Sequence, residues 1–173
     1  MEKALRVIDQ AQRDGLFTSY AVGGGIAALF YIEPIATFDL DIFIVLPEED
    51  SRLISLSPLY SWLKKRGYMP SKEQVIIEGI PVQFIPVYND LVKEGVLKAI
   101  DKKYGDTTAR VISPEYLVAI MLQTSRPKDK ERVLRFLQEA DLDYNALNSI
   151  LVKYSLSAVF EDLRRGSYDG KVS

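Results

Sequence analysis

The spacing of apolar residues predicts alternating helices and strands in the first two thirds of the chain. Apolar side chains recur every three or four positions from Leu5 to Ala11, which is typical of an amphipathic helix, and Gly15 follows as a stop signal. Turn residues and changes of periodicity mark the bounds of the other elements. The pattern predicts strands at 19–22, 38–46, 74–77, 80–87 and 109–112, and helices at 26–32, 53–66 and 89–100.

The strands at 74–77 and 80–87 flank Glu78-Gly79, and this arrangement is typical of a β-hairpin. Pro81 and Pro86 both fall in the second strand. A proline has no N–H to donate to a neighbouring strand. We therefore expect the second strand of the hairpin to lie near an edge of the sheet or to bend.

From Ser113 onward the whole sequence has helical spacing. Ser113, Pro114 and Glu115 form a helix start signal, because serine caps helices, proline fits the first turn and an acid there complements the helix dipole. The last residues, 166–173, are small and polar, and we expect them to fray. Helices are predicted at 114–124, 128–139, 144–155 and 157–165.

These elements predict an α/β fold, or α+β by some definitions. We expect a small mixed sheet of about four or five strands, helices against it, and a C-terminal helical layer. The change of character at Ser113 indicates a core over residues 1–112 and a helical extension over 113–173 that packs on this core.

Composition narrows the possible chemistry. The 173 residues carry 22 lysines and arginines against 24 acids, a formal charge of -2, so no bulk positive field holds a polyanion. The chain has neither cysteine nor histidine, which excludes thiol nucleophiles, disulfides and histidine-dependent triads and leaves carboxylates as acids, bases and metal ligands.

No apolar run approaches the roughly 20 residues that span a bilayer, and the N-terminal segment is charged and amphipathic. We expect a soluble, cytoplasmic protein.

The residues that indicate chemistry lie in two short runs, Val22-Gly23-Gly24-Gly25 and Thr37-Phe38-Asp39-Leu40-Asp41. On a strand, the two aspartates point to one face about 6.5–7 Å apart at Cα, close enough to share one hard cation or bridge two. The glycines precede a short helix, where backbone can approach a phosphate closely. Each run alone also has a plain structural interpretation: a solvated strand face for the acids, and a tight turn for the glycines.

Taken together, the runs VGGGIAALF and TFDLDIFI resemble the signature of the nucleotidyltransferase superfamily of the polymerase β type. The stretch SPEYLVAIMLQTSRPKDKERVLRFL is similar to the helical tail of small prokaryotic abortive-infection and toxin–antitoxin members. The resemblance implies the nucleotidyltransferase fold. It also implies transfer of a nucleoside monophosphate from an NTP to an acceptor with Mg²⁺, or Mn²⁺, as cofactor.

The resemblance further implies roles for individual residues. Asp39 and Asp41 would be the catalytic metal ligands. Nucleotide phosphates would contact the glycines and the cations of a basic turn in the tail, if that tail packs over the site. An exposed interhelical turn is an equally good interpretation of these cations and of Asp129 beside them. The implied nucleotide-binding residues are Gly23, Gly24, Gly25, Arg126 and Lys128.

Three departures from the family pattern open a second interpretation. Where relatives carry a third carboxylate on a later strand, this chain has Gln83, which brings no charge and cannot act as a base. Relatives commonly carry an arginine just before the aspartates, where this chain has Ile35 and Ala36. They also carry a lysine in the first helix of the tail, where this chain has Met121. Glu33 or Glu78 remains open as a substitute acid.

Three functions are therefore compatible with the sequence. The first is a nucleotidyltransferase whose acceptor is RNA, a protein hydroxyl or a small molecule. The second is a catalytically weakened member that binds nucleotide, or acts as the partner protein in a toxin–antitoxin pair. The third is a structural domain in which the glycine and aspartate motifs are relics.

Overall fold

The computed structural model describes residues 1–34, 37–47, 55–71 and 73–169, with side chains up to residue 166. Its centre is a mixed sheet with the strand order β3-β4-β5-β2-β1-β7-β6. The strands are β1 (Ser19–Val22), β2 (Leu40–Val45), β3 (Pro70–Ser71), β4 (Gln74–Ile77), β5 (Ile80–Pro86), β6 (Ile100–Tyr104) and β7 (Thr107–Val111). The sheet confirms the predicted mixed α/β class.

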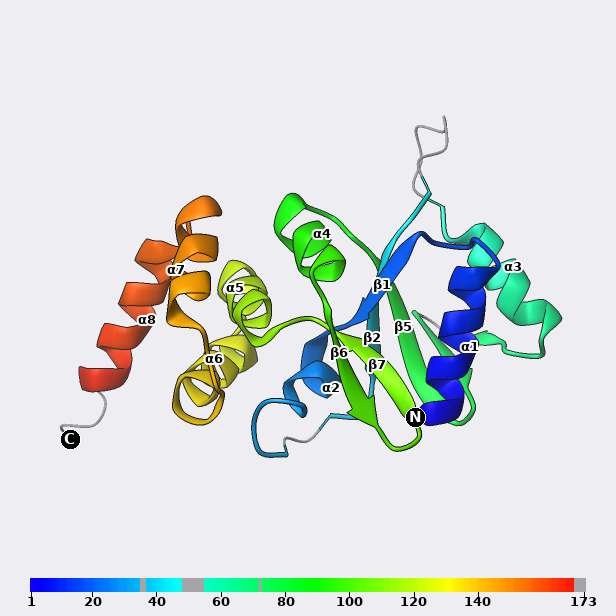
Figure 1. Ribbon diagram of the computed structural model, residues 1–173, viewed down its shortest axis with the longest axis horizontal. Coiled ribbons are helices and arrows are strands. Elements are labelled where there is room, and N and C mark those ends of the chain that lie inside the picture. Colours follow the sequence, from blue (N-terminus) through cyan, green and yellow to red (C-terminus); the bar gives the residue numbers. More distant parts are fainter. Residues whose placement is uncertain (35–36, 48–54, 72, 170–173) are drawn as a thin grey trace.

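Helices cover both faces of this sheet (Figure 1). One side carries α1 and α3, and the other carries α2 and α4, with the C-terminal helices stacked beyond them in the order α5 and α6, then α7 and α8. The helices are α1 (Glu2–Arg13), α2 (Gly24–Ala28), α3 (Ser57–Lys65), α4 (Asp90–Leu97), α5 (Pro114–Thr124), α6 (Pro127–Glu139), α7 (Tyr144–Lys153) and α8 (Ser157–Asp169). The predicted C-terminal helical layer is therefore confirmed.

Strand β2 lies at the middle of the sheet and sets its mixed topology. It runs antiparallel to β1, with Val22 opposite Ile42, and parallel to β5, with Asp41 opposite Gln83. Leu40, Ile42 and Ile44 are fully buried on one side of the strand. Asp41 lies on the other side and Phe43, which is also buried, follows it there. The strand is therefore apolar on both faces except at its beginning.

The second hairpin strand, which we expected near an edge of the sheet or bent, is third in the strand order, with β4 and the two-residue β3 beyond it. Strand β5 lies between β4 and β2, so it is an interior strand. Pro81 pairs only with Ile76 of β4, before the pairing with β2 begins at Val82, and Pro86 pairs only with Ile44 of β2, after the pairing with β4 has ended. Each proline thus occupies a stretch of β5 that has one neighbouring strand, where its missing N–H costs no hydrogen bond.

The sheet has seven strands rather than the predicted four or five. The two missed strands have weak sequence signals, because β3 has only two residues, both exposed, and β6 reads IDKKY. Helix α2 begins at Gly24, two residues before the predicted start, and α8 continues past the predicted end at 165. Among the described residues, no helix combines the length and apolarity needed to cross a membrane. The division at residue 112 stays a prediction.

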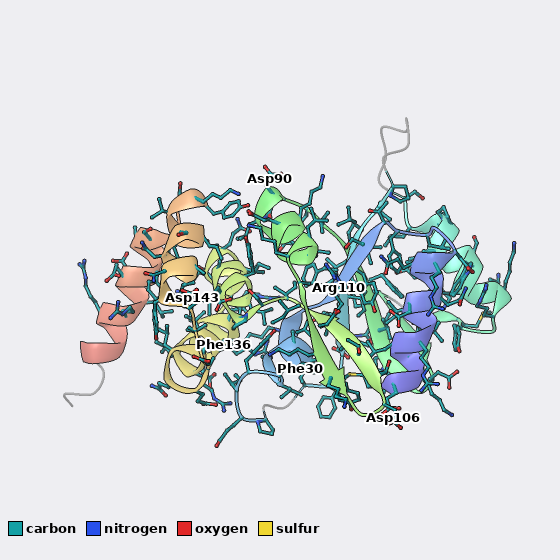
Figure 2. All side chains as sticks on the ribbon, viewed as in Figure 1. Phe30, Asp90, Asp106, Arg110, Phe136 and Asp143 are labelled. Carbon is teal, nitrogen blue, oxygen red and sulfur yellow. The ribbon has the colours of Figure 1, made fainter. Side chains whose placement is uncertain are left out.

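Two sets of contacts attach the helical layer to the core. The ring of Phe136 in α6, labelled in Figure 2, lies 6.2 Å from that of Tyr31, and the Tyr31 hydroxyl donates to the carbonyl of Ile112 at 3.0 Å. The carboxylate of Glu94 in α4 accepts from Lys153 Nζ of α7 at 2.7 Å and from the Tyr154 hydroxyl. The layer is thus fixed to the segment after α2 and to α4.

Candidate active site

The glycine bend, defined as Gly23–Gly25, connects β1 to α2 and contacts the aspartate strand directly. Gly24 has φ +57, a left-handed conformation that favours glycine. A Cβ on Gly24 would lie 1.9 Å from Oδ2 of Asp41, so even an alanine would collide with that carboxylate. The structure therefore brings the bend and Asp41 into van der Waals contact.

The other two glycines of the bend are required mainly by packing. A Cβ on Gly23 would lie 2.3 Å from the Phe43 ring, and the Gly23 N–H donates to the Asp41 carbonyl at 2.9 Å. A Cβ on Gly25 would lie 2.4 Å from Thr37 Oγ1. Among the described residues, no acceptor pairs with the N–H groups of Gly24 and Gly25. These two amides, and not that of Gly23, are thus available to a ligand.

The two aspartates occupy different environments. Asp39 precedes β2 and is exposed, whereas Asp41 lies in β2 and is half-buried. Burial raises the pKa of Asp41, and the negative charge of Asp39 raises the pKa further. Lys128, Arg126 and Arg132 oppose this rise. The carboxylates therefore destabilise each other in their ionised forms, and a bound cation would relieve that repulsion.

Gln83 lies in β5 directly beside Asp41, because the two residues pair in the parallel register of β2 and β5. Its side chain is half-buried. The position at which the resemblance predicts a third acid therefore adjoins Asp41, but it holds a neutral amide.

Neither alternative acid completes a carboxylate triad. The Glu78 carboxylate accepts from the Tyr68 hydroxyl at 2.7 Å in the turn between β4 and β5. Glu33 is exposed, and its backbone N–H donates to Glu139 of α6 at 2.8 Å. Within the described ranges, no group of three acidic side chains is placed to hold a metal ion.

The basic turn, defined as residues 125–128, joins α5 to α6 and is stabilised by a buried acid. Asp129 is only 1% exposed, and its Oδ2 accepts from Arg126 Nε at 2.6 Å and from Thr124 Oγ1 at 2.8 Å. Ser125 takes the left-handed conformation that ends α5. Asp129 thus acts as an anchor for Arg126, while Lys128 next to it is exposed.

Arg132 is the site residue that the sequence analysis missed. Its Nη2 lies 3.4 Å from the place where a Cβ on Gly25 would sit, and its charge lowers the pKa of Asp41. Arg132 follows Lys128 by four residues, so both side chains lie on one face of α6. That spacing is visible in the sequence, but only the position of the Arg132 guanidinium beside Gly25 connects it with the site.

The positive end of this site comes from side chains more than from a helix dipole. Helix α2, which follows the glycines, has only five residues. So short a helix aligns few peptide dipoles, and its positive end is correspondingly weak. Arg126, Lys128 and Arg132 supply full charges at the same place.

The donor set fits a magnesium ion that is bound together with phosphate. Mg²⁺ prefers oxygen ligands and is usually held by one or two carboxylates plus substrate phosphates. Asp39 and Asp41 are two carboxylates close enough to repel each other, next to a bend in which a side chain would fill the space. Either aspartate, or both, would hold the ion.

Comparisons with known proteins support the fold. No protein-family model matches the chain, and no curated protein matches its sequence. The crystal structure of ANT(2'')-Ia in complex with adenylyl-2''-tobramycin is similar with a TM-score of 0.54, at 15% identity over 93% of this chain and 95% of that one. An antigenic nucleotidyltransferase-like protein from Paracoccidioides brasiliensis has a TM-score of 0.52, at 14% identity over 90% and 89%. The solution structure of the antibiotic-resistance factor ANT(2'')-Ia gives 0.51, at 13% identity over 96% of both chains. The chain therefore has the nucleotidyltransferase fold.

Proposed function

We propose that the chain binds an NTP with Mg²⁺, or Mn²⁺, between the glycine bend and the basic turn, and transfers the nucleoside monophosphate to an acceptor. The observation that carries this proposal is the position of Asp41. Its carboxylate touches Gly24 and lies within the electrostatic reach of three cations from the helical layer. Acids for a metal and cations for phosphates thus meet at one place.

Each group has a separate task in this proposal. Asp39 and Asp41 hold the ion, which when bound polarises the phosphoryl group and stabilises the leaving pyrophosphate. Gly24 and Gly25 offer phosphate oxygens their backbone N–H groups, which no described residue accepts. Arg126 and Lys128 bind phosphate oxygens from the opposite side.

The acceptor would carry a hydroxyl or a similar nucleophile, on RNA, on a protein or on a small molecule. ANT(2'')-Ia was crystallised with adenylyl-2''-tobramycin, an adenylylated small molecule. This makes small hydroxyl compounds the first class to test with the present chain.

A second function is favoured by one specific observation, the pairing of Gln83 with Asp41. An amide at this position cannot ligate a second ion as a carboxylate does, and cannot take a proton from an attacking hydroxyl. The alternative is therefore a weakened member that binds Mg²⁺ and NTP without efficient transfer. Such a protein could serve as one partner of a toxin–antitoxin pair.

Transfer from an α-³²P-labelled NTP separates the two functions. The chain would be incubated with each NTP, Mg²⁺ and pools of RNA, protein or small hydroxyl compounds, and label on the acceptor would be measured. The Gln83→Asp variant should raise the rate, since it restores an acid next to Asp41, whereas the matched Gln83→Asn variant should not. Binding of Mg²⁺ and NTP with no transfer by the wild type or by Gln83→Asp would leave the weakened binder as the better account.

A further inference from the structure

We infer that Arg132 is a phosphate-binding residue, and that its guanidinium, together with Gly25, forms a second anion contact separate from the basic turn. This inference rests on the proposed function, because it concerns the same ligand. The resemblance in the sequence implied roles for Arg126 and Lys128 and none for Arg132, and the role of Arg132 is argued from three observations on α6 and the glycine bend.

The first observation is the way in which α6 is held. Along the face that looks toward α2, Arg135 Nη2 donates to the Glu33 carbonyl at 3.3 Å, and Glu139 Oε2 accepts from the Glu33 N–H at 2.8 Å. The buried ring of Phe136 packs against Tyr31, with 6.2 Å between the ring centroids. These contacts fix α6 against the segment after α2, so the start of this face is fixed over the glycine bend.

The second observation is the location of the guanidinium. Arg132 Nη2 lies 3.4 Å from the space that a Gly25 side chain would fill, and its charge acts on Asp41. The Gly25 N–H has no acceptor among the described residues. Arg132 Nη2 and the Thr37 side chain thus both lie beside Gly25, whose N–H no described residue accepts. A backbone donor and a planar guanidinium that lie close together can bind phosphate oxygens.

The third observation is the lack of a carboxylate partner. In the described part of the chain, Arg132 forms no ion pair, whereas Arg126 is tied to Asp129 and Arg135 to Glu139. Arg132 is half-buried, and it follows Lys128 by four residues, a spacing at which like charges repel. No carboxylate thus pairs directly with Arg132, so its guanidinium donors remain available to an anionic ligand.

A matched control exists on the same helix. Lys130 is two residues before Arg132, which is about 200° around an α-helix, so it points to the opposite side. There it lines a groove with Leu134 of α6 and Asp162 of α8. Replacing Lys130 removes one positive charge from α6 without touching the glycine bend.

The test is calorimetric titration of the whole chain with Mg²⁺ plus ATP, GTP, CTP or UTP, with the matching monophosphate, and with pyrophosphate alone. We expect Arg132→Ala to weaken triphosphate and pyrophosphate binding at least about tenfold, because a charge-assisted contact is lost. Arg132→Lys should recover part of the affinity, and Lys130→Ala should bind as the wild type does. Monophosphate binding should change less. Midpoints of urea unfolding without ligand should be the same for all four proteins.

The outcomes separate this inference from the proposed function. If the wild type binds NTP and Arg132→Ala binds it equally well, the inference is overturned while the proposed function stands. If the wild type binds pyrophosphate through Arg132 but no NTP, the inference stands and the proposed function fails. Equal losses in Arg132→Ala and Lys130→Ala would assign the effect to net charge and overturn the inference. A lowered unfolding midpoint with equal loss of every ligand would assign Arg132 a structural role and overturn it as well.

Discussion

The acidic and the cationic halves of the candidate site are positioned by different means. The acidic half is fixed by backbone: Asp41 belongs to a central strand, and the left-handed Gly24 touches its carboxylate. The cationic half consists of side chains on α6 and the basic turn, which a single buried acid, Asp129, and the packing of α6 hold in place.

This difference teaches where the site is rigid and where it can adapt. Strand β2 is paired on both sides, so the Asp41 backbone cannot shift without breaking the sheet. Arg126 and Lys128 are exposed side chains, which reach a ligand at the cost of rotamer entropy. We therefore expect substitutions in the acidic half to abolish binding, and substitutions that loosen the cationic half to weaken it by degrees.

The largest effect should come from removing both negative charges of the acidic half. The double variant Asp39→Asn, Asp41→Asn should weaken Mg²⁺-dependent NTP binding at least about 100-fold, because neutral amides are poor ligands for a hard cation. Titration with and without Mg²⁺ measures this change. Asp141→Asn, an exposed acid beyond α6, is the control and should bind normally. Unchanged binding by the double variant would remove the acidic half from the site.

The next effect should come from the glycine bend. Gly24→Ala introduces a Cβ into the Asp41 carboxylate, so we expect a loss of about 2–4 kcal/mol in the free energy of unfolding from strain and overpacking together. Gly15→Ala is a matched control, because Gly15 has φ +80 but no atom within 4 Å of an added Cβ. Backbone strain alone should lower the free energy of unfolding of the Gly15→Ala variant by about 1 kcal/mol. Urea unfolding measures the loss of unfolding free energy in both variants. Equal losses in Gly24→Ala and Gly15→Ala would mean that contact with Asp41 does not constrain the bend.

A smaller effect should come from loosening the helical layer at Glu94. The pKa of Glu94 falls from 4.5 to about 2, mainly through hydrogen bonds from Lys153 and Lys98. Glu94→Gln should cost about 1–2 kcal/mol of unfolding free energy at pH 7, since both lysines are exposed and water screens them. NTP affinity should fall by less than about threefold, because α5 stays buried against the core.

The pH dependence of the Glu94 effect follows from the sign of the shift. A lowered pKa means that the ionised carboxylate stabilises the fold, so its contribution is complete above about pH 4.5 and is lost as the pH falls toward 2. The difference between wild type and Glu94→Gln should shrink over this window. A constant difference would show that packing, and not charge, is responsible.

The smallest effect should be a gain in stability. Burial and Asp39 raise the pKa of Asp41, so the ionised carboxylate destabilises the metal-free fold as the pH rises through that pKa. Asp41→Asn should therefore be more stable than the wild type at pH 7 by about 0.5–2 kcal/mol in EDTA, and the gain should vanish in acid. Unfolding curves at several pH values test this. A loss of stability at pH 7 would show that the three cations outweigh the burial of Asp41.

The acidic half could be predicted from the sequence because its information is local. Aspartates that alternate with apolar residues predicted the strand that carries Asp41, but Asp39, which we also expected on this strand, precedes it. The Gly23 N–H donates to the Asp41 carbonyl, and the contact of Gly23 with nucleotide phosphates stays a prediction. The roles of Asp39, Asp41, Arg126 and Lys128 in binding stay predictions.

The rest depends on long-range packing, which periodicity does not encode. Arg132 and Glu94 look like ordinary surface charges in the sequence, and they become informative only when α6 meets α2 and α7 meets α4. The register of β5 with its two neighbours could not be predicted for a related reason. Pro81 and Pro86 each lack one backbone N–H, but the sequence does not reveal that each proline lies where β5 pairs with a single neighbouring strand.

The most direct test of the account is hydrogen–deuterium exchange of the wild type with and without Mg²⁺ and the NTP that binds most tightly. If one ligand is held by both halves, amide exchange should slow together over residues 23–28 and 124–132, and neither segment should change with Mg²⁺ alone to the same degree. Protection confined to one of these segments, or absent from both at saturating ligand, would contradict a single site built from the glycine bend, the aspartates and the cations of α6.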